Sequence, residues 1–332
     1  MFVTSECIGG KVIVTNIAVL EFIALNSNVK KFISTSKTSN LQWSISLYKL
    51  QAIGLFPLKQ MEFILDTKPV LRFKILAYKK LKYWFDKELA ILLATKLQEV
   101  EPKFGRKEFV ATIDRKVTAL ELKDRVEVIA DELYDKLGRD YKKALSTLLN
   151  ILGPENEQET GMFTNFYWVM PIAKFIEKYG LQDFEESMYA IKEITKRNTG
   201  EYTIRPFLER HTKKTISQMK KWSKHTNLHV RRLSCEGLRP RLPWAKKLEL
   251  FIENPDPILA ILNSLKDDPS KYVQKSVANC INDILKDNPA TVRTLIEKWN
   301  GKSIGKERKW IIKHALRNLL KADDDWAKKI VG

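Results

Sequence analysis

The most informative stretch of this chain is HVRRLSCEGLRPRLPW, residues 229–244. It begins as a short helical pattern rich in arginine, and Pro240 and Pro243 then stop that pattern. Trp244 follows directly after the second proline. Arginines at this spacing form a rigid basic surface, and a proline-held aromatic beside it is placed to contact a ligand. A phosphate backbone with its bases is the ligand class that this combination indicates.

The helical part of this stretch occurs three times along the chain. Residues 229–238 align without gaps with YVQKSVANCI at 272–281 and with KWIIKHALRN at 309–318, at separations of 43 and 37 residues. HEAT-type helix pairs repeat at about 40–47 residues, and small residues suit positions where two helices approach closely. The alignment therefore predicts an all-α, HEAT-like helical-repeat solenoid with a concave basic surface. The small residues that it superposes are Cys235, Ala278 and Ala315.

Apolar residues recur at helical spacing from about residue 85 to the C-terminus. Glycine and proline fall between the periodic segments, as expected at helix ends. We therefore predict one HEAT-like domain over residues 81–332. Leucine-rich patterns predict helices around residues 89–97 and 120–133. Further helices are predicted at about 141–152, 163–179, 183–197, 214–225, 229–239, 257–266, 271–286, 289–300, 307–321 and 323–330.

The first 80 residues lack this helical spacing of apolar residues and mix β-branched residues with serine and asparagine. We predict that residues 1–80 are an N-terminal extension that is disordered or lies before the true start of the protein. The apolar run at 12–25 is interrupted by Asn16 and Glu21 and is too short to span a membrane. No membrane association is therefore expected.

The charge of the chain indicates a polyanionic partner. It carries 58 Lys+Arg against 40 Asp+Glu, for a formal net charge of +18. Between His211 and Lys247 there are eleven Lys/Arg and a single acid, Glu236. Such a concentration favours nucleic acid. The alternatives are an acidic membrane surface and a solvated basic face without a partner.

Metal and cofactor chemistry have no support in the sequence. The three cysteines are far apart, and the four histidines show no ligand spacing. The sequence contains no P-loop motif for nucleoside triphosphates, no GxGxxG motif for dinucleotides and no GxSxG motif of serine hydrolases. We expect no metal and no cofactor, and the cysteine usage fits a reducing, cytoplasmic setting.

Several motifs resemble the AlkC-type DNA alkylation-repair glycosylases, relatives of the AlkD proteins that are built from HEAT-like repeats. The most specific is RRLxxEGxRPRLPW, which ends at Trp244. The motifs occur in the family's order over about half of the chain. The others are LELKDRV (120–126), the segment from Gly161 to Met170-Pro171, EYTIRPFL (201–208) and SVANCINDILKDNP (276–289).

The resemblance implies a monofunctional DNA glycosylase that removes cationic N-methylated bases such as 3-methyladenine and 3-methylcytosine. Its partner would be double-stranded DNA with alkylated bases, and the protein would act as a monomer. The immunoglobulin-like domain that some members append is expected to be absent. The family's catalytic carboxylates match Glu201 and Asp283, and its aromatic residue matches Trp244. Its DNA-binding arginines match positions among Arg231, Arg232, Arg239 and Arg241.

The same residues suit the chemistry without the resemblance. Loss of a cationic base leaves positive charge on the deoxyribose, which fixed carboxylates and a positioned water stabilise. Structural alternatives stay open: Glu201 as a helix cap, Asp283 in an ion pair, Trp244 in packing, and the arginines paired with acids of neighbouring helices. Arg205 is either a phosphate contact, and so a further DNA-binding residue, or a buried partner of a carboxylate. Two other functions also remain, a non-catalytic HEAT-like DNA-binding protein and a solenoid that binds an acidic protein.

Overall fold

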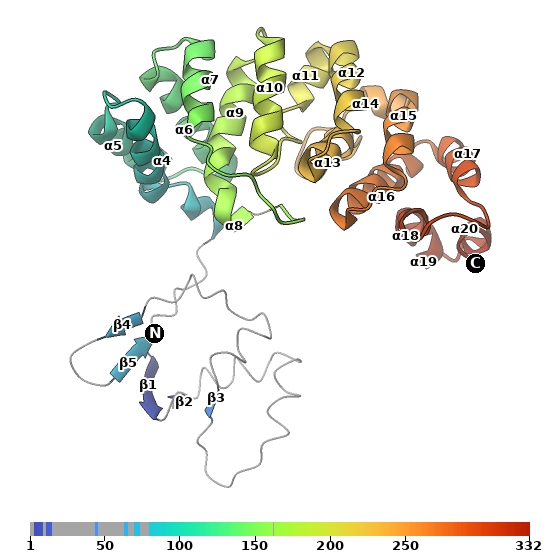
Figure 1. Ribbon diagram of the computed structural model, residues 1–332, viewed down its shortest axis with the longest axis horizontal. Helices are drawn as coiled ribbons and strands as arrows, with labels where there is room; N and C mark the ends of the chain where they lie inside the picture. Colours follow the sequence, from blue (N-terminus) through green and yellow to red (C-terminus); the bar gives the residue numbers. More distant parts are fainter. Residues whose placement is uncertain are drawn as a thin grey trace. The chain divides into compact units, whose positions relative to one another are not determined.

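A computed structural model describes residues 80–161 and 163–332, together with the backbone of five short strands nearer the N-terminus. The chain divides into two compact units, Met1–Lys80 and Leu81–Gly332 (Figure 1). The strands of the first unit form an antiparallel sheet in the order β3-β2-β1-β5-β4. The prediction that residues 1–80 are disordered or precede the true start falls mostly outside the described residues. The strands are β1 (Val3–Ile8), β2 (Lys11–Val14), β3 (Ser44–Ile45), β4 (Phe63–Leu65) and β5 (Val70–Phe73).

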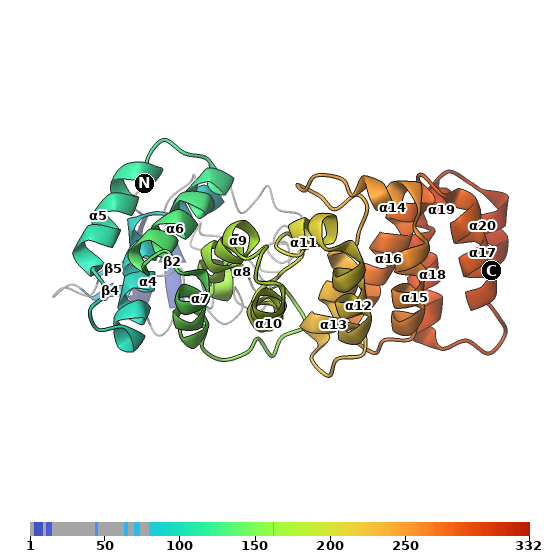
Figure 2. The same ribbon diagram turned by 90° about the horizontal axis from the view of Figure 1, so that it is seen from above.

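The second unit is all-helical, and its described residues contain no strand. Its helices follow one another in an arched row of pairs (Figures 1 and 2). They are η2 (Leu81–Trp84), α4 (Lys87–Val100), α5 (Arg106–Val117), α6 (Leu122–Lys136), α7 (Tyr141–Asn150), α8 (Phe163–Phe166), η3 (Tyr167–Val169), α9 (Met170–Tyr179), α10 (Phe184–Thr195), α11 (Arg205–Arg210), α12 (Thr212–Trp222), α13 (Leu228–Glu236), α14 (Glu249–Glu253), α15 (Asp256–Leu265), α16 (Lys271–Leu285), α17 (Pro289–Trp299), α18 (Lys306–Ala315), α19 (Arg317–Lys321) and α20 (Asp325–Val331).

The three aligned segments form consecutive helices of one layer. Helix α13 packs on α16, and α16 packs on α18, whereas α12, α15 and α17 form the other layer (Figure 1). Cys235, Ala278 and Ala315, which the alignment superposes, are all fully buried. The helical-repeat fold predicted from the alignment is therefore confirmed.

Two predicted helices are interrupted, and two short helices were not predicted. The segment 163–179 divides at the 3-10 turn Tyr167–Val169, because the ring of Pro171 is incompatible with a continuous α-helical turn back to the carbonyl of Tyr167. The segment 307–321 divides at Leu316. Helices α11 and α14 have six and five residues, too few for a periodic pattern to show.

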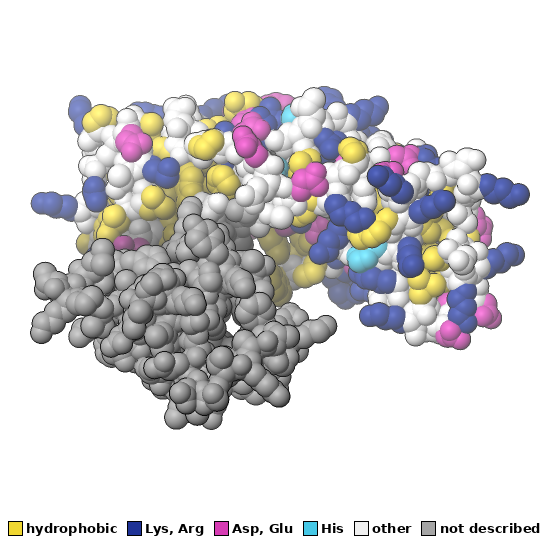
Figure 3. All heavy atoms as spheres, turned by 60° about the horizontal axis from the view of Figure 1, so that its bottom comes forward, with side chains coloured by type: hydrophobic (Ala, Val, Ile, Leu, Met, Phe, Trp, Pro, Cys, Tyr) yellow, Lys and Arg dark blue, Asp and Glu magenta, His cyan; other side chains and the backbone are white. Residues whose placement is uncertain are grey.

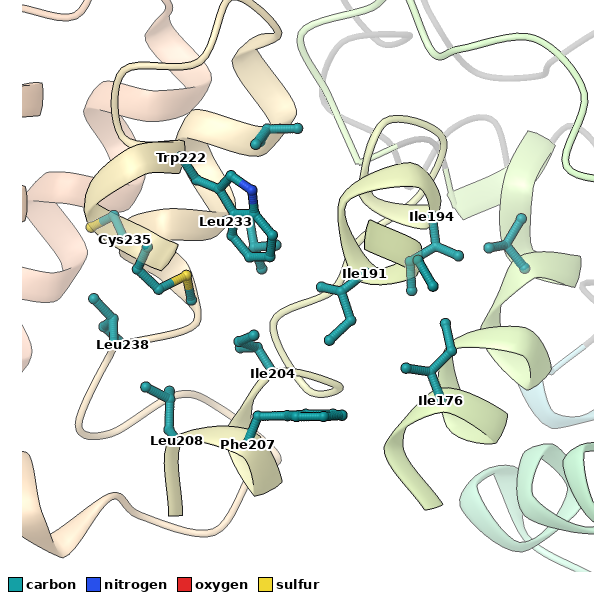
Figure 4. Packing of buried hydrophobic residues seen from close by; sticks show 14 of the residues in the cluster. Ile176, Ile191, Ile194, Ile204, Phe207, Leu208, Trp222, Leu233, Cys235 and Leu238 are labelled. Atoms are coloured by element: carbon teal, nitrogen blue, oxygen red, sulfur yellow. The ribbon is translucent and has the colours of Figure 1, made fainter. Parts of the chain in front are cut away.

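The central core fixes the helices that carry the candidate site. Figure 4 shows buried hydrophobic side chains from neighbouring helices packed together. They include Ile191 of α10, Ile204 just before α11, Phe207 of α11, Trp222 of α12 and Leu233 of α13. Complete burial of one such side chain stabilises the fold by about 1.5–3 kcal/mol. These contacts hold the segment before α11 against α13.

Helix α13 begins and ends at residues suited to those positions. The side chain of Asn227 caps its start by accepting hydrogen bonds from the backbone N–H groups of His229 and Val230. Gly237 follows its last residue, where a Cβ atom would lie 2.6 Å from a methyl carbon of Ile204. A glycine therefore lets the end of α13 approach the segment before α11, and this brings Glu236 and Glu201 into one cluster.

Candidate active site and nucleic-acid interface

Three buried carboxylates and two arginines form one cluster, which we call the charge ladder. Glu201 precedes α11, Glu236 ends α13 and Asp283 lies near the end of α16; their exposed fractions are 7%, 6% and 4%. Arg232 pairs with Glu201 at 3.4 Å and with Glu236 at 3.5 Å. Arg239 pairs with Glu236 and with Asp283, both at 2.8 Å. The ladder thus alternates in sign and holds three acids against two bases.

The five ladder residues alone carry a formal charge of −1, and the half-exposed Lys286 adds one positive charge at the edge of the cluster, 3.8 Å from Asp283. Buried ions require such pairing, because removal from water costs several kcal/mol for each ion. Burial raises the pKa of Glu236, but Arg232 and Arg239 outweigh it and hold that pKa below its usual range. The Ser276 hydroxyl also donates a 2.7 Å hydrogen bond to Glu236. Glu236 is therefore a fully satisfied carboxylate at the centre of the ladder.

Asp283 differs from Glu236 in having a less satisfied oxygen. Its Oδ2 accepts the hydrogen bond from Arg239, whereas Oδ1 lies 3.8 Å from Lys286 Nζ and accepts no hydrogen bond from the residues that the structure describes. Burial raises the pKa of Asp283 above its usual range, although Arg239 and Lys286 oppose this. Oδ1 is thus the ladder oxygen best placed to accept a hydrogen bond from a water or a ligand.

Glu201 is not a helix cap. The cap position of α11 is Ile204, and no side chain caps that helix. Its carboxylate instead faces Arg232, whose guanidinium lies over the ring of Tyr272 at 4.5 Å and also donates to Thr199 at 3.2 Å. These contacts fix the guanidinium and, through it, the direction of Glu201.

Trp244 is exposed over 83% of its surface, so the packing alternative for this residue is wrong. Its φ of +62° lies in the left-handed region, which costs a non-glycine residue about 1–3 kcal/mol. Two side chains from other elements hold the backbone here: Lys123 of α6 donates to the Trp244 carbonyl at 2.8 Å, and the Tyr202 hydroxyl donates to the Pro243 carbonyl at 3.2 Å. Tyr202 follows Glu201 directly, so the backbone that carries the exposed indole is linked to the ladder.

Of the two alternatives for Arg205, the structure does not show the carboxylate partner, and the phosphate contact stays a prediction. Its guanidinium is buried and donates to backbone carbonyls of Gly237, Arg239 and Lys246, at 3.4 and 3.0 Å for the first two. Burial lowers the pKa of Arg205 to about 10. Arg205 therefore holds the backbone of the segment that carries Arg239 and Trp244.

The other predicted arginines also have partners within the chain. Arg231 binds Asp268 through two nitrogens, at 2.6 and 3.2 Å, and Arg241 binds Asp287 in the same way, at 2.7 and 2.6 Å. The structure thus shows the alternative of pairing with acids of neighbouring segments. Their contact with DNA stays a prediction, because any phosphate would share them with these carboxylates.

Other kinds of site have little support in the described part of the chain. Within residues 80–161 and 163–332, no three His, Cys, Asp or Glu side chains are grouped so as to hold a metal ion. None of the helices described there is long and apolar enough to cross a membrane. Two surface hollows, between α4 and α5 and between α15 and α17, are lined by none of the ladder residues. The ladder therefore lies outside these two hollows.

Glu236 is the ladder residue that the sequence analysis did not propose. It stands alone as an acid among eleven Lys/Arg between His211 and Lys247. An isolated acid in so basic a stretch is a signal of a buried ion pair, and the structure shows that pair with both Arg232 and Arg239.

Comparison with known proteins places these features in a family. Residues 106–319 match the family described as DNA alkylation repair enzyme. The chain belongs to this family. The resemblance predicted from the motifs is thus confirmed.

Two relatives share most of the helical part. An uncharacterized protein, YhaZ, of Bacillus subtilis is 38% identical over 253 residues, which cover 76% of this chain and 68% of the relative. The solved structure of the alkylpurine DNA glycosylase AlkC of Pseudomonas fluorescens, bound to DNA with an abasic site analog, is 34% identical with a TM-score of 0.71. That match covers 77% of this chain and 69% of the other. A structure of AlkD2 from Streptococcus mutans matches at 28% identity with a TM-score of 0.46, over 64% of this chain and 97% of that one.

Proposed function

We propose that this DNA alkylation repair protein is a monofunctional DNA N-glycosylase. It excises cationic alkylated bases, of the 3-methyladenine and 3-methylcytosine type, from double-stranded DNA. The observation that carries the proposal is the charge ladder, a buried cluster with one surplus negative charge beside the exposed Trp244. The similarity to an alkylpurine DNA glycosylase supports it. The activity belongs to residues 81–332, which contain the ladder and the family match.

The proposed chemistry needs negative charge and water. A base methylated on a ring nitrogen leaves with the electron pair of its bond to C1′, and positive charge develops on the deoxyribose. Glu201 and Asp283 stabilise this charge electrostatically, which is effective because buried charges are weakly screened. Water then attacks C1′ and its proton passes to a carboxylate. Oδ1 of Asp283 orients that water, since this oxygen accepts no hydrogen bond from the described residues.

The arginines of the ladder have a positioning role in this scheme. Arg232 and Arg239 hold three carboxylates close together, which mutual repulsion would otherwise oppose. They do so without neutralising the cluster completely. The surplus charge is therefore available to a cationic sugar.

Trp244 contributes through the face of its ring. A cation over an indole is stabilised by about 0.5–2 kcal/mol, so Trp244→Ala should slow base release by about 2- to 30-fold. Because this side chain is exposed, the melting temperature should not change. Single-turnover kinetics on methylated duplex measure the effect, and Trp244→Phe is the control that keeps a ring. A Trp244→Ala rate equal to the wild-type rate would remove the indole from the mechanism.

The choice of lesion tests the whole proposal. We expect release of 3-methyladenine from methylated duplex, and far slower release of hypoxanthine or uracil from otherwise identical duplexes. A neutral base is a poor leaving group unless a proton donor protonates it. The buried carboxylates of the ladder act through their negative charge and do not donate a proton. Comparable rates for neutral bases would contradict the mechanism. Duplex binding without release of any base would instead indicate the second candidate, a non-catalytic HEAT-like DNA-binding protein.

A further inference from the structure

A group of cations at the C-terminal end of the helical layer lacks acidic partners. Lys271 and Lys275 lie one turn apart on α16, and neither has an acidic oxygen within 4.0 Å among the described residues. Arg317, which begins α19, donates to the His314 carbonyl and to the Asn279 side chain, both uncharged. Residues 306–321 carry six Lys/Arg and a single acid, Glu307. Arg308 pairs with Asp267 and Lys306 with Glu307, whereas Lys271, Lys275 and Arg317 have no acidic partner among the described residues.

In the N-terminal half of the helical unit, many lysines are bound by carboxylates, several of them across neighbouring helices, as in the pair between Lys178 and Asp131 at 2.8 Å. In the view of Figure 3, Lys and Arg side chains gather over the C-terminal helices, with few acids among them. The other paired lysines of that half include Lys87, Lys116, Lys136, Lys142, Lys174, Lys192 and Lys196.

Aromatic rings hold part of this group in place. Lys271 Nζ lies 3.4 Å from the centre of the Trp310 ring, and Trp310 stacks on His314 at 4.7 Å with 11° between the planes. Partial desolvation lowers the pKa of Lys271. Burial lowers the pKa of His314, and repulsion from Arg317, Lys275 and Lys271 lowers it further. An anion bound here would relieve this repulsion.

We infer that Lys271, Lys275, Trp310, His314 and Arg317 form a binding surface for the DNA backbone, which we call the α16–α18 surface. The inference rests on the proposed function for the identity of its polyanion. It differs from the DNA-binding prediction for Arg231, Arg232, Arg239, Arg241 and Arg205, because those guanidiniums already have partners within the chain.

The position of this surface fits a duplex that crosses the charge ladder. Helix α16 carries Asp283 near its C-terminal end and Lys271 at its N-terminal end. Twelve residues of α-helix span about 18 Å, and phosphates follow each other every 3.4 Å or so along a strand axis. A strand whose sugar is at Asp283 therefore has phosphates within reach of the surface, away from the reacting base. The surface would bind the DNA backbone beside the lesion and would not contact the reacting atoms.

The test is a double variant, Lys271→Gln/Lys275→Gln, in the full chain. Its affinity for an undamaged duplex should fall about 10-fold at moderate salt, and the slope of log Kd against log salt should fall by roughly one for each lysine. Fluorescence anisotropy over a salt series measures both. The matched control is Lys220→Gln/Lys221→Gln on α12, two exposed lysines of the other helical layer without acidic partners in the described part. The control should change the slope little.

Base release separates this inference from the proposed function. At limiting enzyme, base release by Lys271→Gln/Lys275→Gln should fall in proportion to its loss of affinity, whereas Lys220→Gln/Lys221→Gln should keep the wild-type rate. An unchanged salt slope in this variant, with melting temperature preserved, would overturn the inference while leaving the glycosylase intact. A wild type that binds duplex through these lysines but releases no base would support the surface and refute the glycosylase. A wild type that does not bind duplex would refute the inference.

Discussion

Asp283→Asn is expected to slow base release about 100- to 1000-fold, the usual effect of removing one preorganised electrostatic group from a site. The variant keeps an oxygen for Arg239 and so preserves the fold, but it removes the charge and the acceptor that orients water. Affinity for duplex should be equal or tighter, because a negative charge near phosphate is lost. Release under single-turnover conditions and Kd by anisotropy measure the two effects, and Glu201→Gln should behave in the same direction.

Asp287→Asn is the matched control for this experiment. Asp287 lies four residues beyond Asp283, just past the end of α16 at Leu285, and its partner Arg241 lies two residues beyond Arg239. This outer pair is more exposed and is not part of the ladder, so its loss should leave base release within about twofold. Normal excision by Asp283→Asn, or an equal defect in both variants, would contradict the assignment.

The pH profile gives a second readout of Asp283. Because burial raises its pKa, activity should fall on acidification at a pH above the ordinary aspartate range near 3.9. Activity should fall, and not rise, because the mechanism requires the ionised carboxylate of Asp283 and protonation removes its charge. The rate of base release by Asp283→Asn should be low at every pH and should not show this fall on acidification.

Arg205→Met is expected to destabilise the fold by about 3 kcal/mol. Three backbone carbonyls lose a buried donor, and each lost hydrogen bond costs about 1 kcal/mol. For a unit of this size, this lowers the melting temperature by about 6–12 °C. Activity should fall as well, since Arg205 holds the segment that carries Arg239 and Trp244. Thermal unfolding and base release measure the two effects.

Arg241→Met is the matched control, since it removes an arginine from the same segment. Arg241 forms a partly exposed pair with Asp287, and such pairs contribute up to about 1 kcal/mol. Its melting temperature should therefore change much less. If Arg205→Met melts like the wild type and loses only DNA affinity, Arg205 is a phosphate contact and its positioning role is wrong.

The repeat architecture was predictable because it depends on local periodicity. The helical layer of α13, α16 and α18, and the burial of Cys235, Ala278 and Ala315, follow from three aligned segments of ten residues. The short helix α11 was not predictable in this way, because its position depends on Arg205 and on packing against α13.

The partners of the arginines were beyond the reach of the sequence for a different reason. Arg239 meets Asp283 across 44 residues, and Arg231 meets Asp268 across 37. A repeat fixes which helices are neighbours, but the choice between a solvent-facing and an acid-facing arginine depends on the rotation of each helix. That rotation comes from packing of the whole layer, and so the sequence showed where charge lies but not which charges cancel.

The charge ladder has a consequence for how this repeat protein can vary. In most solenoids each repeat contacts only its neighbours, so units can be gained or lost anywhere along the array. Here a single run of ion pairs links the segment before α11 to α13 and then to α16. An insertion or deletion of a helix pair within that run would break the alternation of charge and leave buried ions unpaired. Changes in repeat number are therefore compatible with this site only outside that run, and the central repeats must be inherited as one unit.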